Sequence, residues 1–335
     1  MIDRREQNNQ LILSFIVVSI FSLVTLVSFG IGADDLGYLI DWDDTYPLYE
    51  YLINNKQMHH SSLELFYLYI FSFFKLFTND FEVFKFFNTF VTLSVMAYSY
   101  YKISKKYYLY MLLYMLFYLF IDFNIDQFRN ALAASFGLLA IVLLVEKKLK
   151  YSIILFVFSF LIHNSMIWLF VIYLSKNEKL NKIMIISLIV IVLLPNKFIY
   201  LSDIFDYISS FPGLSSFHIF SKIIGYLDTS LDGLIINSLY SFVIFKLILL
   251  TFIAYKIKID KIYFHAFLYA LLLYYALIDL HTIGGRIVRD IYLLEPIIVY
   301  FALIKKKEYI LIILPIVLYN LFTKNIILIE RITNG

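Results

Sequence analysis

Long apolar runs separated by short basic clusters recur along the whole of this chain. A transmembrane helix needs about 20 mostly apolar residues. Runs near that length fall at residues 11–29, 82–101, 107–121, 130–145, 183–195, 234–255, 262–280, 288–304 and 309–323. The 335 residues are 61% hydrophobic and 16% charged, whereas soluble domains are about 45–50% apolar and about 25% charged. The sequence therefore predicts an all-α, polytopic transmembrane helix bundle.

The composition also excludes several kinds of site. The chain has no cysteine, which rules out disulfides, Fe–S clusters and zinc sites with thiolate ligands. We expect no cofactor, and the sequence has no P-loop or GxGxxG context. We also expect no nucleic-acid partner, because the basic residues lie between apolar runs rather than in one patch. The first run is long enough to span a bilayer and lacks a small-residue cleavage pattern, so we expect a membrane helix there.

Six basic clusters fix the expected topology. The positive-inside rule places all of them in the cytoplasm. They are Arg4/Arg5, Lys102/Lys105/Lys106, Lys147/Lys148/Lys150, Lys176/Lys179/Lys182, Lys256/Lys258/Lys261 and Lys305/Lys306/Lys307. This placement requires that Leu63–Phe77 enters the outer interface without crossing. It also requires that Tyr151–Ser175 forms two short helices, which meet at an outward-facing tip around His163.

The result is a single integral membrane domain over residues 1–335 with about 11 membrane helices. The bilayer would be that of a bacterial cytoplasmic membrane. Its outer loops would span about 30–81, 122–129, 163–165, 196–232 and 281–287. The two long loops, 30–81 and 196–232, carry most of the aspartates. Any chemistry is therefore expected on the outer face.

Acidic residues open the first outer loop. A carboxylate of Asp34 or Asp35 there could act as general base toward a hydroxyl, or simply belong to a solvated turn, since Asp and Gly are ordinary turn residues. Asp41, Asp43 and Asp44 could ligate a divalent cation. Acids in a wet loop are more often only solvated, so we expect no metal site.

A lone arginine, Arg129, stands where the loop 122–129 enters the apolar run 130–145. Helix N-termini favour phosphate, and the planar guanidinium matches phosphate bidentately. The alternative is a salt bridge from Arg129 to Asp122 or Asp126. Both readings account for an arginine at the lip of a membrane helix, where an unpaired charge is costly.

Two more outer segments carry polar groups. His163, Asn164 and Ser165 form either a hydrogen-bonded hairpin tip or a ligand contact. Arg286 and Arg289, three residues apart, would share one helix face, where each could instead snorkel to the interface. Arginines on the outer side run against the positive-inside rule, and an anionic ligand on that face is their simplest common cause.

At these residues the chain resembles the EpsG family, relatives of Wzy-type polysaccharide polymerases. The similarity covers about residues 30–300 as an ordered set of short motifs. These are Gly32, Asp34 and Tyr38; Phe123, Asn124, Arg129, Asn130 and Ala133; Ile162, His163 and Ser165; and an arginine with a tyrosine, Arg289/Tyr292 or Arg286.

This chain also departs from the family pattern at two places. The family's E/D-P-G-F motif is replaced by residues 61–65, Ser-Ser-Leu-Glu-Leu, so no role is carried over there. The arginine block is longer by about two residues, which leaves Asp126 and Gln127 unassigned.

The resemblance implies a GT-C-like architecture with an interfacial helix in the first outer loop. It implies a glycosyltransferase that joins undecaprenyl-diphosphate-linked oligosaccharides into an exopolysaccharide, capsule or O-antigen at the lipid bilayer. A polysaccharide chain-length regulator is a further expected partner.

The resemblance also implies roles for particular residues. Asp34 would be the general base, with Asp35 as its substitute. Arg129 and one of Arg286 and Arg289 would stabilise the departing diphosphate, and His163 would orient it or relay a proton. The remaining matched polar residues, which would bind substrate, are Tyr38, Asn124, Asn130 and Ser165. The alternatives are a flippase for the same lipid-linked unit, or a ligase of the same architecture.

Overall fold

The computed structural model describes residues 4–28, 32, 34–54, 56–57, 63–193, 236–276, 285, 288–305, 307–309, 311, 313–315 and 318. The chain divides into two compact units, Met1–Ile167 with Lys307–Gly335, and Trp168–Lys306. Each is described by itself, and the single membrane domain stays a prediction. All the elements in the described ranges are helical, as the sequence predicts. The predicted loop 196–232 lies outside those ranges.

Five helices form the body of the first unit, with α7 at its centre. They are α1 (Arg4–Leu26), α5 (Phe81–Ile103), α6 (Tyr108–Tyr118), α7 (Phe128–Val145) and α8 (Leu149–Ile162). Helix α7 packs against α5 and α8, and α1 packs against α5. Small residues let membrane helices approach closely, and hydroxyls bond across them. Accordingly, Ser159 on α8 donates to the Ala133 carbonyl oxygen on α7, at 2.6 Å.

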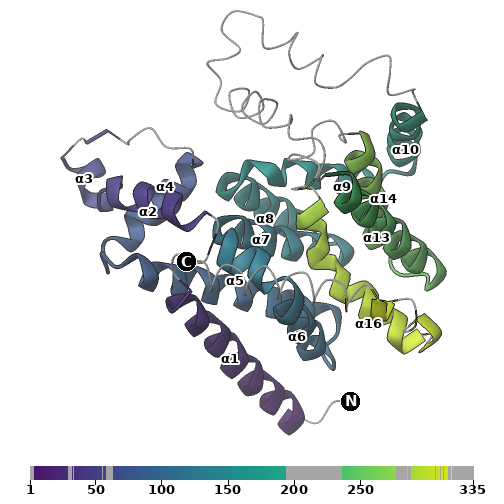
Figure 1. Cartoon of the computed structure of the whole chain (residues 1–335), viewed down its shortest axis with the longest axis horizontal. Helices are drawn as coiled ribbons and strands as arrows, with labels where there is room; N and C mark the ends of the chain where they lie inside the picture. The colour runs from purple at the N-terminus through teal and green to yellow at the C-terminus, as the bar shows by residue number, and fades with distance from the viewer. Residues whose placement is uncertain are drawn as a thin grey trace, which may run out of the picture. The chain divides into compact units, whose positions relative to one another are not determined.

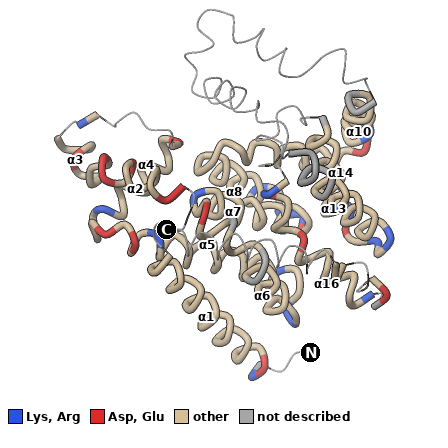
Figure 2. Tube along the Cα trace, in the orientation of Figure 1, with Lys and Arg blue, Asp and Glu red and all other residues tan. Residues whose placement is uncertain are grey.

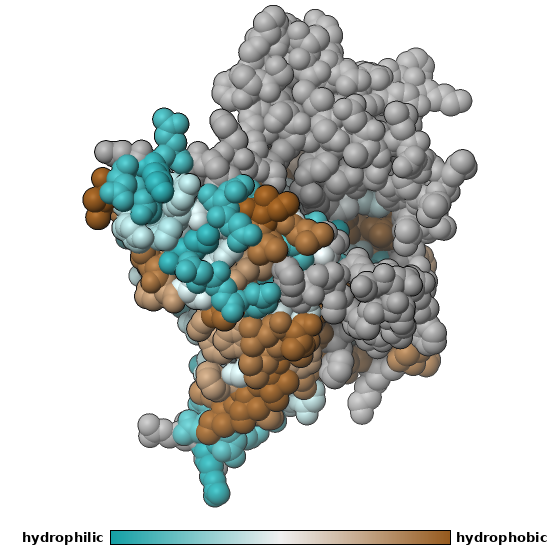
Figure 3. Space-filling view, turned by 60° about the vertical axis from the view of Figure 1, so that its left-hand side comes forward, coloured by the Kyte–Doolittle hydropathy of each residue, from teal (hydrophilic) through white to brown (hydrophobic). Residues whose placement is uncertain are grey.

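Apolar surface and helix length indicate a membrane protein. Two of the described helices, Arg5–Leu26 and Phe128–Val145, are long and apolar enough to cross a bilayer. The first of them exposes an apolar band that includes Ile12, Phe15 and Ile20, each at least 54% exposed. Figure 3 shows this brown band on α1, between a teal tip at the start of α1 and a teal cap. Lipid would cover such a band.

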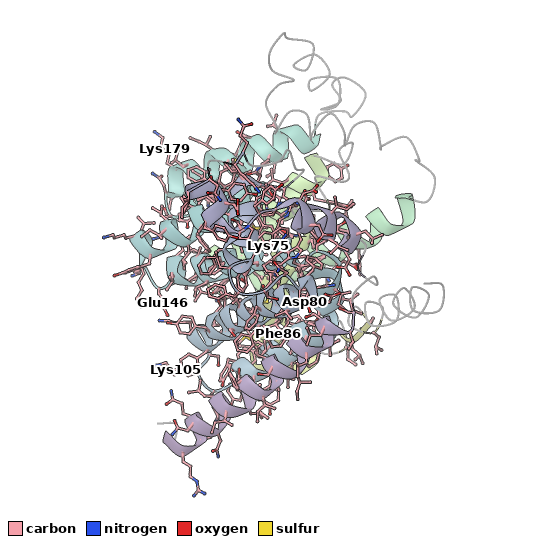
Figure 4. All side chains as sticks on the ribbon, turned by 90° about the vertical axis from the view of Figure 1, so that its left-hand side faces the viewer. Lys75, Asp80, Phe86, Lys105, Glu146 and Lys179 are labelled. Atoms are coloured by element: carbon pink, nitrogen blue, oxygen red, sulfur yellow. The ribbon has the colours of Figure 1, made fainter. Side chains whose placement is uncertain are left out.

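The basic clusters of the first unit lie together at one end of its helix bundle. Gln10 near the start of α1 donates to the Lys106 carbonyl oxygen, which follows α5, at 3.4 Å. Glu146, at the end of α7, pairs with Lys102 at 3.4 Å and with Lys148 at 2.8 Å. In Figure 4, Lys105 and Glu146 lie on one side of the unit and Asp80 on the other, at the opposite end of α5. Most of the length of α1, α7 and α8 between these ends carries no charge (Figure 2).

Three shorter helices gather at the other end of α5. They are α2 (Asp35–Asp44), α3 (Leu48–Leu52) and α4 (Leu65–Phe74), seen together in Figure 1. Trp42 anchors α2 by packing against Phe71 on α4 and Phe84 on α5. The 10 residues of α4 rise only about 15 Å, half of the roughly 30 Å hydrocarbon core. This length agrees with the expectation that the segment does not cross, while its place at an interface stays a prediction.

The predicted loop 122–129 is wrong in its conformation. Residues Ile121–Asp126 form a π-helix, η1, that continues from α6 almost to α7. The polar residues of this segment suggested a loop. Phe123 and Ile125 are buried, however, and their burial keeps the segment within the packed helix bundle. Short π-helical turns are frequent at functional sites.

The helix predicted to break near His163 does break there. Helix α8 ends at Ile162, and His163 takes an extended conformation, with φ −150° and ψ 117°. A 3₁₀-helix, η2 (Asn164–Leu169), and then α9 (Phe170–Leu174) follow. The outward direction of this tip stays a prediction.

The second unit also gathers its basic clusters at one end. Beyond α9 it contains α10 (Glu178–Leu193), α13 (Ile236–Lys256), α14 (Lys261–Ala276), η5 (Tyr292–Leu294) and α16 (Glu295–Lys305), whereas η6 (Lys307–Tyr309) belongs to the first unit. The amino group of Lys305 donates to the Ile257 carbonyl oxygen at 2.7 Å. Lys261 lies 3.8 Å from Glu178.

Candidate functional site around Glu64

One carboxylate of the first unit joins three separate helices. Glu64 is the N-terminal flanking residue of α4, and its side chain is 6% exposed. Its Oε2 accepts from Arg129 Nη1 on α7 at 2.6 Å. Its Oε1 lies 3.1 Å from His163 Nδ1 at the end of α8 and accepts from the Asn164 backbone N–H at 3.2 Å. We call these four residues the Glu64 cluster.

Arg129 keeps donors beyond the one that Glu64 uses. Its guanidinium carries five N–H donors in a planar fork, and its side chain is 11% exposed. The Nε atom is buried and has no hydrogen-bond partner within the described part of the chain. Arg129 therefore offers a partly buried cation with an unused donor, which is the chemistry that an anionic oxygen requires.

The start of α2 lies beside the Glu64 cluster. The Tyr38 ring packs on Phe128 with 4.4 Å between centroids, and the Arg129 guanidinium carbon lies 5.7 Å from the Tyr38 centroid. Asp34, the exposed residue before α2, is near enough to interact electrostatically with Arg129. Aromatic rings, a carboxylate and a cation thus share one region.

Gly32 brings this segment against the π-helix. A Cβ atom built on Gly32 would lie 2.3 Å from the Ile125 carbonyl oxygen and 2.8 Å from the Asp35 carboxyl carbon. Real Cβ contacts are essentially never below 3.0 Å, so only glycine fits this close approach of two backbones.

A fully buried ion pair holds α2 to α5. Lys85 Nζ lies 2.7 Å and 2.9 Å from the two oxygens of Asp35, and both side chains are 0% exposed. The Gly32 backbone N–H also donates to Asp35, at 3.2 Å. Removing one partner of a buried pair costs about 3–5 kcal/mol. These contacts favour a positioning role for Asp35.

Neutral hydrogen bonds continue the network between α4, α5 and α7. The Tyr67 hydroxyl donates to Asn88 Oδ1 at 3.2 Å. Asn88 Nδ2 in turn donates to the Phe128 carbonyl oxygen at 3.0 Å. Asn88 thereby fixes the first turn of α7, which carries Arg129.

Comparison with known proteins identifies the family of this chain. The family model described as EpsG family matches residues 11–333, nearly the whole length. The chain belongs to the EpsG family. No curated protein and no solved structure matches it. EpsG membership supports a membrane protein of polysaccharide biosynthesis.

Three of the EpsG motif segments meet in the first unit. The segment with Gly32, Asp34 and Tyr38 lies against η1 and the first turn of α7, which holds Arg129. His163 joins Arg129 through Glu64. Residues assigned separately from the sequence are therefore neighbours. Their catalytic and binding roles remain predictions.

The ionic partner of Arg129 is a carboxylate that we did not expect from the sequence. The sequence offered Asp122 and Asp126, whereas the structure pairs Arg129 with Glu64. Asp126 is instead close enough to Lys85 for electrostatic interaction. Glu64 precedes Arg129 by 65 positions, so this pairing follows from the packing of the helices rather than from local sequence.

The other predicted binding residues of this region have different environments. Asn124 in η1 is 0% exposed, and neither side-chain polar atom has a hydrogen-bond partner among the described residues. Asn130 is 2% exposed in the first turn of α7. Ser165, in η2, is half-buried. A buried amide such as Asn124 without partners is rare and suits a polar ligand.

The remaining predicted arginines belong to residues 286–289. Arg289 lies in the second unit, and its Nη1 is buried without a hydrogen-bond partner in the described ranges. Asp290, beside it, accepts from Trp168 Nε1 at 3.1 Å. Arg286 lies outside the described residues.

Sequence reasoning missed three buried ionisable residues and gave no role to Glu64. Lys85 is described above, and in the second unit Lys246 pairs with Glu295 at 2.7 Å, both side chains 1% exposed. Lys246 Nζ also lies 3.7 Å from the Tyr292 ring centroid. Lys246 is a lone charge in an apolar stretch, and Lys85 and Glu295 also lie in mostly apolar segments. Such residues inside a membrane are usually paired and functional. That signal was present in the sequence.

Proposed function

We propose that this chain is a multi-pass membrane glycosyltransferase of the Wzy-like kind. It would polymerise undecaprenyl-diphosphate-linked oligosaccharide repeat units into an exopolysaccharide, capsule or O-antigen. The observation that carries the proposal is the pairing of Arg129 with Glu64 and His163 at one end of the first unit. The basic clusters lie at the opposite end, and the positive-inside rule favours the cytoplasm for them. The site would then face outward from the bacterial cytoplasmic membrane.

In the proposed architecture about 11 membrane helices form a GT-C-like bundle, and α4 is the interfacial helix of the first outer loop. Such a bundle would open its site toward the lipid that carries the substrate. A chain-length regulator is the protein partner that we expect beside it.

Arg129 would stabilise the leaving group. In the proposed reaction, a hydroxyl of one lipid-linked unit attacks the anomeric carbon of the growing glycan, and the diphosphate departs. A cation fixed in advance where negative charge develops is most effective in a site with little water. Glu64 fixes the guanidinium through Nη1, and the remaining donors are available to phosphate oxygens.

Two groups beside Arg129 are candidates for taking the hydroxyl proton. Asp34 is exposed and lies within electrostatic reach of Arg129. His163 contacts the Glu64 carboxylate. The proposed substrate-binding residues are the polar or aromatic neighbours of these groups in the family motifs, namely Tyr38, Asn124, Asn130 and Ser165.

Arg289 is proposed as a further phosphate ligand on the basis of its buried, unbonded Nη1. Arg286 keeps the same proposal from the sequence alone. Each is tested separately by its own alanine variant, assayed as below for polymer formation.

A flippase for the same lipid-linked unit is the rival function. Flippases and related transporters usually carry internal repeats, with the binding site near the bilayer midplane. Here the Glu64 cluster joins helix ends rather than helix centres, which favours chemistry at the surface of the membrane. A ligase of the same architecture would differ only in its acceptor.

The test combines a deletion strain with purified protein. Cells that lack the chain should accumulate lipid-linked monomer on the outer leaflet, and accumulation on the inner leaflet would instead indicate a flippase. Monomer extracted from these cells is then added to proteoliposomes that contain the full chain. A ladder of longer glycans is the expected product. If no ladder forms although controls show that the lipid-linked monomer is active, the polymerase proposal is rejected.

A further inference from the structure

The Glu64 cluster contains a carboxylate–imidazole contact that goes beyond the family motifs carried over from the sequence. Glu64 Oε1 lies 3.1 Å from His163 Nδ1, and both side chains are 6% exposed. The same carboxylate binds the Arg129 cation through its other oxygen, at 2.6 Å. A neighbouring cation and the Asn164 backbone N–H both favour the ionised form of Glu64.

An ionised carboxylate can only accept hydrogen bonds. His163 Nδ1 must therefore be the nitrogen that carries the proton in this contact. In a neutral imidazole the other nitrogen, Nε2, is then the basic one. Carboxylates that hold a histidine in one tautomer, and that stabilise its cationic form, are a recurring feature of general-base catalysis.

We infer that His163 Nε2 is the general base of the proposed glycosyl transfer, and that Glu64 is the positioning residue that makes it so. The inference rests on the proposed function and chooses between its two candidate bases. Asp34, the other candidate, is exposed at the start of α2, where Arg129 interacts with it. A nearby cation weakens a carboxylate as a base.

The atoms balance as follows in a single displacement. The acceptor hydroxyl gives its proton to His163 Nε2 while its oxygen forms a bond to the anomeric carbon. The bond from that carbon to the diphosphate oxygen breaks, and its electron pair leaves on the diphosphate beside Arg129. The imidazolium, held by Glu64, then releases the proton to water. Glu64 thus positions both the base, His163, and the cation, Arg129, for the same reaction.

The charged and titratable groups that face this pair come from several elements. Arg129 on α7 contacts Glu64 directly. Tyr67 on α4 interacts electrostatically with Glu64 and Arg129, and Tyr38 and Asp34 at the start of α2 interact with Arg129. Arginine stays protonated at every pH used in assays. Arg129 therefore adds no titration of its own to a pH–rate profile.

The pH–rate profile of polymerisation tests the role of Glu64. The probe is monomer extracted from the deletion strain, added to proteoliposomes of the full chain at saturating concentration. Glu64→Gln keeps an oxygen that accepts from Nδ1 but removes the negative charge. Protonation of His163 stops the reaction, and the charge of Glu64 favours that protonation. The acid limb of the profile should therefore move to lower pH in Glu64→Gln, by about one unit or more.

Glu50→Gln is the matched control, because Glu50 lies on α3 and pairs with Lys56 at 3.3 Å. It should leave both the rate and the acid limb unchanged. Asp34→Asn should keep the acid limb at the wild-type pH, whatever its effect on the rate. An unmoved acid limb in Glu64→Gln, or its loss in Asp34→Asn, would overturn the inference.

A second variant decides the question even if Glu64→Gln does not fold. In His163→Asn the amide nitrogen takes the place of Nδ1 and still donates to Glu64, but no atom replaces Nε2. We expect kcat to fall about 10²- to 10⁴-fold, the usual contribution of a general base. KM should stay within about threefold of the wild-type value, because a general base contributes to the chemical step rather than to binding. A wild-type rate in His163→Asn would reject His163 as the base. If wild-type protein itself forms no polymer, the proposed function fails instead.

Discussion

The side chain of Glu64 connects residues that are distant in the sequence. Arg129 follows it by 65 positions and His163 by 99. Each of these two residues is expensive to bury alone near a bilayer. One ionised carboxylate offsets the cost of burying both side chains, because each of its oxygens contacts a different one of them. The geometry of the candidate site therefore depends on Glu64 more than on either motif residue.

Gly32 allows a residue-scale prediction about folding. Gly32→Ala places a methyl group 2.3 Å from the Ile125 carbonyl oxygen, and overpacking of this kind costs about 1–3 kcal/mol. We expect a lower melting temperature for the purified protein in detergent. Gly37→Ala is the matched control, because nothing lies within 4 Å of its Cβ position. Alanine there should stabilise α2 by up to about 1 kcal/mol. Equal melting temperatures for the two variants would contradict this account of Gly32.

The sequence predicted some of these residues and missed others for physical reasons. Arg129 and His163 interrupt apolar runs, and the cost of charge in a bilayer makes such interruptions visible. Glu64 stands at the start of an apolar segment, where an acid could also be an ordinary helix-flanking residue. Only the fold shows that Arg129 and His163 converge on it.

At the scale of elements, helix ends set the position of the site. Glu64 precedes α4, Arg129 lies in the first turn of α7, and His163 follows α8. The apolar runs, together with the positive-inside rule, located all three helices. It could not predict the π-helix Ile121–Asp126, because a π-turn has no compositional signature distinct from that of an α-helix or a loop.

The start of α5 provides an element-scale prediction. Asp80 Oδ1 accepts from the backbone N–H of Glu82 at 3.0 Å and of Val83 at 3.4 Å. The pKa of Asp80 lies below its ordinary value, because the Glu82 side chain and then the Val83 N–H hydrogen-bond the carboxylate. Asp80→Ala should destabilise the protein by about 1 kcal/mol at pH 7.

The sign of its pH dependence follows from the lowered pKa. The contribution of Asp80 is complete above the unfolded-state value, about 3.9, and is lost as the pH falls through the folded-state value. Asparagine caps helices about as well as aspartate. Asp80→Asn should therefore match wild type at pH 7 and lose less stability on acidification, as measured by melting temperature. A steeper acid loss in Asp80→Asn than in wild type would contradict the capping role.

At the scale of the molecule, charge is sorted along the helices of each unit. The clusters that the positive-inside rule groups together do meet within each unit, through Lys102, Glu146 and Lys148 in the first and through Lys261 and Lys305 in the second. The all-α class was predictable because continuous apolar runs near 20 residues cross a bilayer as helices, in which the backbone polar groups are bonded within the segment. The division into two units was not, since it depends on packing between helices far apart in sequence.

We propose that Arg129, held by Glu64, binds phosphate through its planar fork. The most direct measurement is the rate of polymerisation in proteoliposomes for Arg129→Lys and Arg129→Ala, at matched protein levels and with the monomer described above. Lysine keeps the charge but cannot bind Glu64 and a phosphate in one fixed plane. We expect both variants to lose about 10²- to 10³-fold in rate. Rescue by lysine would reduce the role of Arg129 to charge alone, and normal polymerisation by the alanine variant would contradict the claim.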